Sequence, residues 1–127
     1  FLEKAAVKYE KNTAAIAFFN SGICAKMMGD FDMAISYMEK AVNRSPNYKS
    51  PIVELSSLMI KKQDYQRAAN LLERFNELST PTALSLYTGY LISRKKGEIN
   101  ESKRLRILLK NLFPFSKENI ELTKLSQ

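Results

Sequence analysis

Apolar and polar residues recur along most of the chain with the spacing of amphipathic helices. Residues 34–42 place apolar side chains on one face at intervals of three and four, and residues 68–78 repeat the arrangement. We expect helices over the following ranges: 13–28, 31–44, 50–62, 65–78, 82–96, 99–113 and 117–126. Five of the six turns between them hold a glycine or a proline, Gly29, Pro46, Pro81, Gly97 and Pro114, because these residues stop or restart a helix. The pattern predicts an all-α fold without strands.

The pattern returns with a period of 34 residues. Asp30, Asp64 and Glu98 coincide in this register, each at the expected start of a second helix. Further sets coincide as well: Phe18, Ile52 and Leu86; Ala25, Met59 and Ser93; Met38, Leu72 and Arg106; Ala41, Phe75 and Leu109. A period of this length with one helix pair per unit is typical of a stacked helical array.

The unit over residues 15–48 resembles the tetratricopeptide repeat. Aromatic, small and turn-forming residues carry the resemblance: Phe18, Gly22, Ala34, Ala41 and Pro46, with Ala68 and Pro114 at corresponding places in later units. It implies one domain, a tetratricopeptide-repeat helical solenoid of about three helix pairs with a partial first helix. The implied segments are 1–12, the end of a preceding repeat; 15–48 and 49–82, two repeats; 83–116, a degenerate repeat; and 117–127, a capping helix.

In such a solenoid the first helices of successive units line a concave groove that holds a peptide or a helix. The groove positions of the family fall on the following residues: Phe19, Ile23, Lys26, Met27, Val53, Ser57, Ile60, Lys61, Tyr87, Leu91, Arg94 and Lys95. An apolar floor and a basic rim suit an amphipathic segment with acidic flanks, because the rim charges steer association. Phe19, Ile23 and Leu91 also fit an ordinary core, and both interpretations stay open.

Composition narrows the chemistry further. The 127 residues include no histidine and one cysteine, which excludes histidine-dependent catalysis, an internal disulfide and a thiolate metal cluster. No glycine-rich phosphate loop, paired-cysteine motif or catalytic triad is present, and no apolar run reaches the roughly 18 residues of a transmembrane helix. We therefore expect neither an enzyme nor a cofactor or metal site. The net charge of +7 favours anionic surfaces.

Two smaller features have structural explanations. Asp30 and Asp32 lack the further oxygen ligands of a calcium loop, and the return of Asp30 as Asp64 and Glu98 indicates that these carboxylates cap helices. Cys24 precedes the small residue Ala25, so we expect a buried apolar group and not a nucleophile.

The third unit carries a group of basic residues: Arg94, Lys95, Lys96, Lys103, Arg104, Arg106, Lys110 and Lys117. A nucleic-acid or lipid-headgroup patch is one interpretation, but only Phe113 and Phe115 lie nearby in the sequence for base stacking. The group favours a solvated helix face or a contact with an acidic partner.

The whole chain resembles the C-terminal two thirds of the type IV pilus biogenesis and stability proteins, the PilF or PilW pilotin family. The resemblance rests on the order of the units and on residues 109–116, which read Leu-Lys-Asn-Leu-Phe-Pro-Phe-Ser before a short helix. Residues 7–13 also resemble the lengthened connection between early repeats of that family.

This resemblance implies a protein partner in the groove, either the pilus secretin or another component of the pilus machine. It implies a role in secretin assembly or pilus stability, on the periplasmic side of the outer membrane through an upstream lipid anchor. The alternative is a generic cytoplasmic repeat scaffold or co-chaperone-like adaptor, although Phe19, Ile23, Val53 and Ser57 replace the Lys and Asn of a chaperone carboxylate clamp. A nucleic-acid-binding repeat protein comes third.

Overall fold

The computed structural model describes residues 2–125, with the side chains of residue 8 and of residues 10–125. Seven helices and no strand make up these residues: α1 (Leu2–Met27), α2 (Phe31–Arg44), α3 (Lys49–Lys61), α4 (Tyr65–Leu78), α5 (Ala83–Lys96), α6 (Ile99–Leu112) and α7 (Lys117–Leu125). The predicted all-α fold is confirmed. Apart from the start of α1, the expected and observed helix ends differ by at most one residue, and the expected end of the last helix at residue 126 lies outside the described residues.

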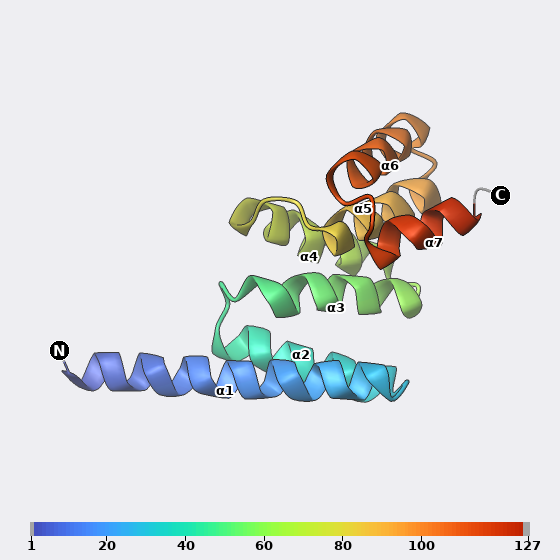
Figure 1. Ribbon diagram of the computed structural model, residues 1–127. Coiled ribbons are helices and arrows are strands. Elements are labelled where there is room, and N and C mark those ends of the chain that lie inside the picture. The colour runs from blue at the N-terminus through green and yellow to red at the C-terminus, as the bar shows by residue number, and fades with distance from the viewer. Residues whose placement is uncertain (1, 126–127) are drawn as a thin grey trace.

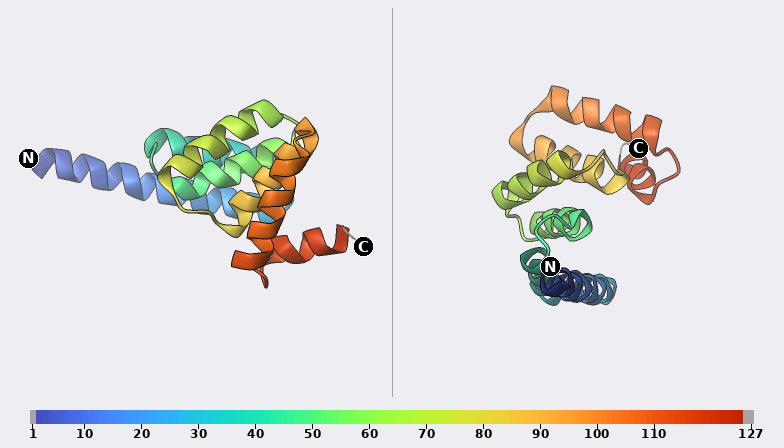
Figure 2. Two further views of the ribbon diagram at one scale, coloured as in Figure 1. Left: turned by 90° about the horizontal axis from the view of Figure 1, so that it is seen from above. Right: turned by 90° about the vertical axis from the view of Figure 1, so that its left-hand side faces the viewer.

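The helices form three hairpins, α1 with α2, α3 with α4, and α5 with α6, which stack on one another (Figure 1). The second helix of each hairpin packs on the first helix of the next, α2 on α3 and α4 on α5. Seen from the side, the hairpins are successive layers (Figure 2). The short helix α7 covers the last layer by packing on α5 and α6.

The apolar stripes of the amphipathic helices form two separate cores. The larger core extends from α1 to α5 and is centred on side chains with little or no exposed surface, such as Met38, Leu55 and Phe75. The smaller core joins Leu86 of α5, Leu109 of α6 and Leu122 of α7. The third hairpin therefore shares more apolar contacts with the capping helix than the first two hairpins do.

Helix α1 differs from the sequence prediction. The expected linker at residues 7–13 is wrong, because α1 runs without a break from Leu2 to Met27 and residues 2–12 extend the first helix instead of ending a separate one. The segment contains no glycine or proline, and Lys, Glu and Ala are strong helix formers. The first turns of α1 project beyond the stacked hairpins (Figure 2). Neither α1 nor another described helix combines the length and apolarity that crossing a membrane requires.

Carboxylates cap two of the second helices as predicted. Asp30 accepts a hydrogen bond from the Met33 amide at 3.1 Å, and Asp64 accepts one from the Arg67 amide at 3.2 Å. Glu98 occupies the corresponding place before α6 but makes no capping bond with its side chain. The prediction therefore holds for the first two units and fails in the third, where the longer side chain does not bond to the free amides.

Candidate functional site

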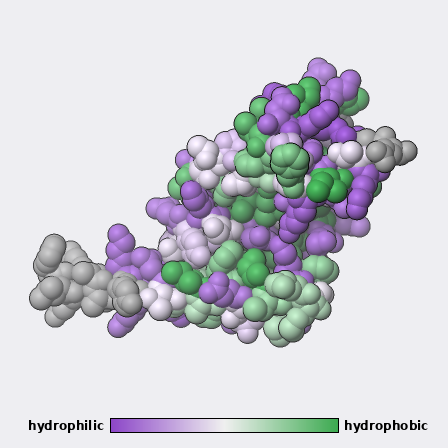
Figure 3. Space-filling model, in the orientation of Figure 1, coloured by the Kyte–Doolittle hydropathy of each residue, from purple (hydrophilic) through white to green (hydrophobic). Residues whose placement is uncertain are grey.

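The predicted groove lies on the first helices of the hairpins, the face that Figure 3 shows together with α7. Five of its apolar side chains are half-buried: Phe19, Ile23, Ile60, Tyr87 and Leu91. The first four of them also pack against the two cores. Val53 is only 6% exposed and belongs to the larger core, whereas Met27 is 80% exposed. Ser57 is half-buried. The structure thus places most of the predicted apolar groove residues between core and surface.

The Phe19 ring has a fixed position in this groove. Its centroid lies 5.5 Å from that of the Tyr48 ring, which precedes α3. Burial raises the pKa of the Tyr48 hydroxyl. The half-buried Phe19 side chain is therefore packed against an aromatic neighbour.

The basic groove residues contact side chains of the chain itself. Lys26 forms an ion pair with Glu54 at 2.8 Å, so α1 and α3 are linked across the groove. Lys61 lies over the Phe31 ring at 4.8 Å, and Lys95 lies over the Tyr65 ring at 5.5 Å, which is the same contact 34 residues later.

Arg94, the fourth basic groove residue, also contacts a side chain of the chain itself. The Arg94 guanidinium donates a hydrogen bond to the Tyr90 hydroxyl at 3.1 Å. Each cation of the predicted basic rim therefore has a contact, but among the described residues only Lys26 is neutralised by a carboxylate. Lys61, Arg94 and Lys95 contact neutral aromatic side chains and keep their charge.

The capping helix adds acidic residues that the sequence reasoning did not assign to the groove. Burial raises the pKa of the Tyr87 hydroxyl, and the carboxylates of Glu121 and Glu118 on α7 raise it further. Glu118 and Glu121 are three residues apart, so a helix over 117–126 places them on one face. Their spacing in the sequence therefore predicts that the two carboxylates lie on the same side of α7.

The residues predicted to set the repeat register occupy packing positions in the first two units. Ala34, Ala41 and Ala68 are fully buried. A Cβ atom on Gly22 would lie 2.9 Å from Cε of Met38, so glycine permits the close approach of α1 and α2. The remaining three lie at the edges of the hairpins: Phe18 stacks on Tyr37, and Pro46 and Pro114 are exposed in turns.

Cys24 corrects a further expectation. Its side chain is exposed, not buried. Successive residues of a helix point in directions about 100° apart, so Cys24 turns away from the interface that buries its neighbour Ala25.

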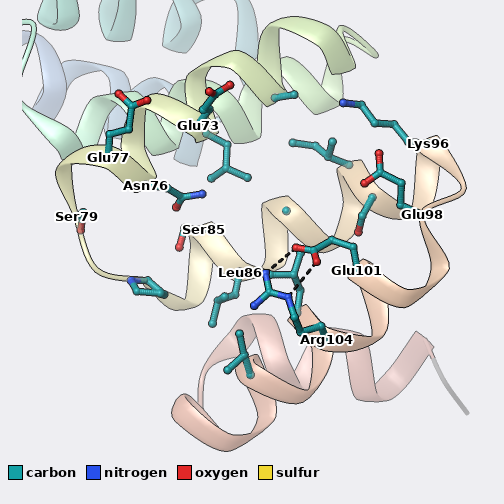
Figure 4. A pocket seen from close by; sticks show the side chains of 18 residues that line it. Glu73, Asn76, Glu77, Ser79, Ser85, Leu86, Lys96, Glu98, Glu101 and Arg104 are labelled. Carbon is teal, nitrogen blue, oxygen red and sulfur yellow. Dashed lines mark hydrogen bonds and ion pairs between the residues drawn. The ribbon is translucent and has the colours of Figure 1, made fainter.

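A cleft that the sequence prediction did not include lies between α4 and α6, with α5 as its floor (Figure 4). Its volume is about 740 Å³. Apolar residues of all three helices line it: Ala69, Leu72, Leu86, Gly89, Ile92, Leu105 and Leu108. Glu73 and Glu77 stand at the α4 edge, and Glu98 and Glu101 come from the α6 side (Figure 4).

In the 34-residue register, the floor of the cleft carries smaller residues than the corresponding part of α3. We call the contact region of α2, α3 and α4 the first junction, and that of α4, α5 and α6 the second junction. Floor residues on α5 are smaller than their counterparts on α3: Ser85 for Pro51, Gly89 for Leu55 and Ser93 for Met59. Leu72 and Leu105 close over Gly89, where a Cβ atom would lie 3.3 Å and 3.1 Å from their methyl carbons.

The side chains that cross the two junctions differ as well. Three contacts cross the first junction: Asp32 with Lys62, Glu39 with Arg67, and the Arg74 guanidinium with the Pro46 carbonyl oxygen. The corresponding pairs of the second junction are Gln66 with Lys96, Glu73 with Glu101, and Leu108 with Thr80. Within the described part of the chain, none of these three pairs forms a hydrogen bond or an ion pair.

Two of the charged residues that line the cleft, Glu101 and Arg104, pair with each other. Glu101 accepts two hydrogen bonds from Arg104, at 2.6 Å and 3.0 Å. The bonds from Arg104 hold the pKa of the Glu101 carboxyl below its usual range. The sequence contains one signal for this site. In the 34-residue register Glu73 aligns with Glu39 and Glu101 aligns with Arg67, so two like charges replace an ion pair.

The basic group of the third unit is divided among different surfaces. Lys96 and Arg104 line the cleft, whereas Arg106 donates a hydrogen bond to the Leu122 carbonyl oxygen and so ties α6 to α7. Lys103, Lys110 and Lys117 are exposed. With Arg94 and Lys95, which contact Tyr90 and Tyr65, five of the eight residues therefore have a structural contact or border the cleft.

Comparisons with known proteins identify the architecture. Residues 16–48 match the family model of the tetratricopeptide repeat. PilF of Pseudomonas aeruginosa has a similar structure, with a TM-score of 0.76 and 24% identity over 87% of this chain and 50% of that chain. PilW, described as a widely conserved type IV pilus biogenesis factor, gives a TM-score of 0.67 and 22% identity over 86% of this chain and 50% of that one.

The first tetratricopeptide-repeat domain of Spaghetti (RPAP3), bound to the HSP90 peptide SRMEEVD, is similar too. Its TM-score is 0.76, with 18% identity over 91% of this chain and 95% of that chain. No curated protein sequence matches the chain. The chain spans about half the length of PilF and PilW, and at these identities the likeness establishes the fold. The chain thus has the tetratricopeptide-repeat fold that its sequence predicts.

Proposed function

From this fold, we propose that the chain is a non-enzymatic protein-interaction module of a type IV pilus machine. Its groove would hold a segment of the pilus secretin or of another machine component and so support secretin assembly or pilus stability. The C-terminal end carries the proposal: residues 109–116 have the closing pattern of the PilF or PilW family, and α7 follows and packs on α5 and α6. The folds of PilF and PilW support it.

The groove chemistry favours a largely apolar segment. Phe19, Ile23 and Leu91 keep part of their surface exposed, so a partner would remove apolar area from water there. Lys26 is neutralised by Glu54, and α7 adds carboxylates at the far end. Apolar contacts would therefore supply most of the affinity, and acidic flanks would add less than the sequence alone suggests.

The proposal includes a location. By resemblance to the pilotin family, the module would act on the periplasmic side of the outer membrane, attached through a lipid anchor upstream of residue 1.

Deleting the gene in the source bacterium tests the role. We expect loss of surface pili and fewer secretin multimers on immunoblots of membranes. Restoring the gene should restore both, whereas a copy with Phe19→Glu and Tyr87→Glu should not, because two charges would enter the apolar groove. The variant must keep the circular dichroism spectrum of the natural chain. Normal pili and normal multimers in the deletion strain would exclude the proposal.

A chaperone adaptor is the second candidate, because the similar Spaghetti domain binds an HSP90 peptide. The groove of this chain has Phe19, Ile23 and Val53 where a carboxylate clamp needs Lys and Asn. We therefore expect no binding of the peptide SRMEEVD in isothermal titration calorimetry. Binding that is lost when the terminal carboxylate is amidated would favour the adaptor over the pilus module.

A further inference from the structure

We propose that the cleft between α4 and α6 is a second docking site, which takes an amphipathic basic segment of a partner protein. Apolar side chains of the segment would enter the cleft, and lysine or arginine side chains beside them would meet the glutamates. This site lies on the second helices of the hairpins and is separate from the groove of the proposed function.

The size and lining of the cleft fit side chains. A volume of about 740 Å³ is in the range of pockets that bind small organic groups, and it is too small for a whole helix. Leu86 and Ile92 on α5 supply an apolar floor and Leu105 on α6 an apolar side, so several aliphatic or aromatic side chains could be buried together.

The charge of the cleft selects the partner. Its lining contains four glutamates, Glu73, Glu77, Glu98 and Glu101, and two basic residues, Lys96 and Arg104, hence a net charge of −2. The chain as a whole carries +7. The cleft is thus an acidic region on a basic protein, and a basic segment is complementary to the cleft but not to the rest of the surface.

The first junction shows which groups the second one lacks. There the Arg67 guanidinium bonds to Glu39 at 2.8 Å across the gap between α2 and α4. In the 34-residue register Glu73 and Glu101 take the places of Glu39 and Arg67, and among the described residues Glu73, Glu77 and Glu98 have no side-chain hydrogen bond or ion pair. A cation from a partner would replace the guanidinium that is absent here.

Two synthetic peptides provide the probe. Both have leucines at helical spacing; in one the remaining positions are lysine, and in the other they are glutamate. We expect the lysine peptide to bind in fluorescence anisotropy, with shifts of the Asn76 and Gly89 amide signals in nuclear magnetic resonance spectra. Non-specific attraction to a chain of charge +7 would instead favour the glutamate peptide.

Variants locate the binding. Glu73→Lys with Glu77→Lys should weaken the lysine peptide about tenfold, because two attractions become repulsions, while the Glu101 and Arg104 pair is untouched. The matched control is Glu10→Lys with Asn43→Lys and Asn47→Lys, which makes the same total charge change at exposed residues outside both the cleft lining and the groove and should leave the affinity within about twofold at moderate salt. Ala69→Ile, which introduces the residue found 34 positions earlier, should also weaken binding by filling the cleft from its α4 side.

The outcomes separate this site from the groove. The pair Phe19→Glu and Tyr87→Glu should leave the lysine peptide bound, even though it tests the proposed function. Equal weakening by the cleft variant and its control, or loss only in the groove variant, would overturn the proposal. So would a concentration-dependent dimer that Glu73→Lys with Glu77→Lys abolishes in sedimentation velocity, because a second copy would then occupy the cleft.

Discussion

The two junctions of the solenoid have the same helix order and different contents. The first junction has large apolar residues on α3 and an ion pair between Glu39 and Arg67 across its outer side. The second has small residues on α5 and glutamates, Glu73 and Glu101, at both places of that pair, and a cleft opens there. A repeat fold fixes the path of the backbone, whereas each interface between its units depends on a few side chains.

The division of the core follows from the same difference. The larger core continues across the first junction, and at the second junction it gives way to the smaller core of α5, α6 and α7. The third hairpin thus depends on α7 for part of its apolar packing. Solenoid stability is a sum of unit and interface terms, so a weaker interface leaves the third hairpin more reliant on its cap.

The largest expected difference in stability is between an apolar side chain of the first junction and one of the second. Leu55→Ala should lower the free energy of unfolding by about 2–5 kcal/mol, because it leaves a cavity in a fully enclosed site. Leu105→Ala should cost clearly less, since Leu105 is half-buried and one side of it faces the cleft. Urea unfolding followed by circular dichroism measures both values. An equal loss of unfolding free energy in the two variants would contradict the distinction between an enclosed first junction and an open second junction.

Replacing the residues before α4 and α6 should give a smaller difference in stability. Asp64→Ala removes the bond to the Arg67 amide and should destabilise by about 1 kcal/mol. Glu98→Ala should have almost no effect, because the Glu98 side chain makes no capping bond. The same unfolding measurement applies to both, and a larger loss for Glu98→Ala would show that the third unit is capped after all.

The sequence alone predicted the elements well, for physical reasons that can be named. The helices α2 and α4 carry a complete apolar stripe and a capping aspartate, so their bounds follow from local chemistry. The sequence prediction did not extend the first helix over residues 2–12. A family resemblance suggested a linker at residues 7–13, where the residues themselves favour a helix.

The residues of the candidate groove were predicted from their positions in the repeat, and their role in binding a partner remains a prediction. Its electrostatics could not be derived, because the pairing of Lys26 with Glu54 and the approach of α7 to Tyr87 depend on how helices stack. The cleft depends on pairs of residues in different units. Only a comparison of pairs, such as Glu39 and Arg67 with Glu73 and Glu101, reveals it.

A pair of double-mutant cycles tests most directly whether the two junctions differ as described. For Glu39 and Arg67, whose side chains are 41% and 45% exposed, replacing each by alanine singly and together should give a favourable coupling of about 0.2–1 kcal/mol. For Glu73 and Glu101 the coupling should be zero or repulsive. A favourable coupling of equal size at both pairs, or none at Glu39 and Arg67, would contradict the account.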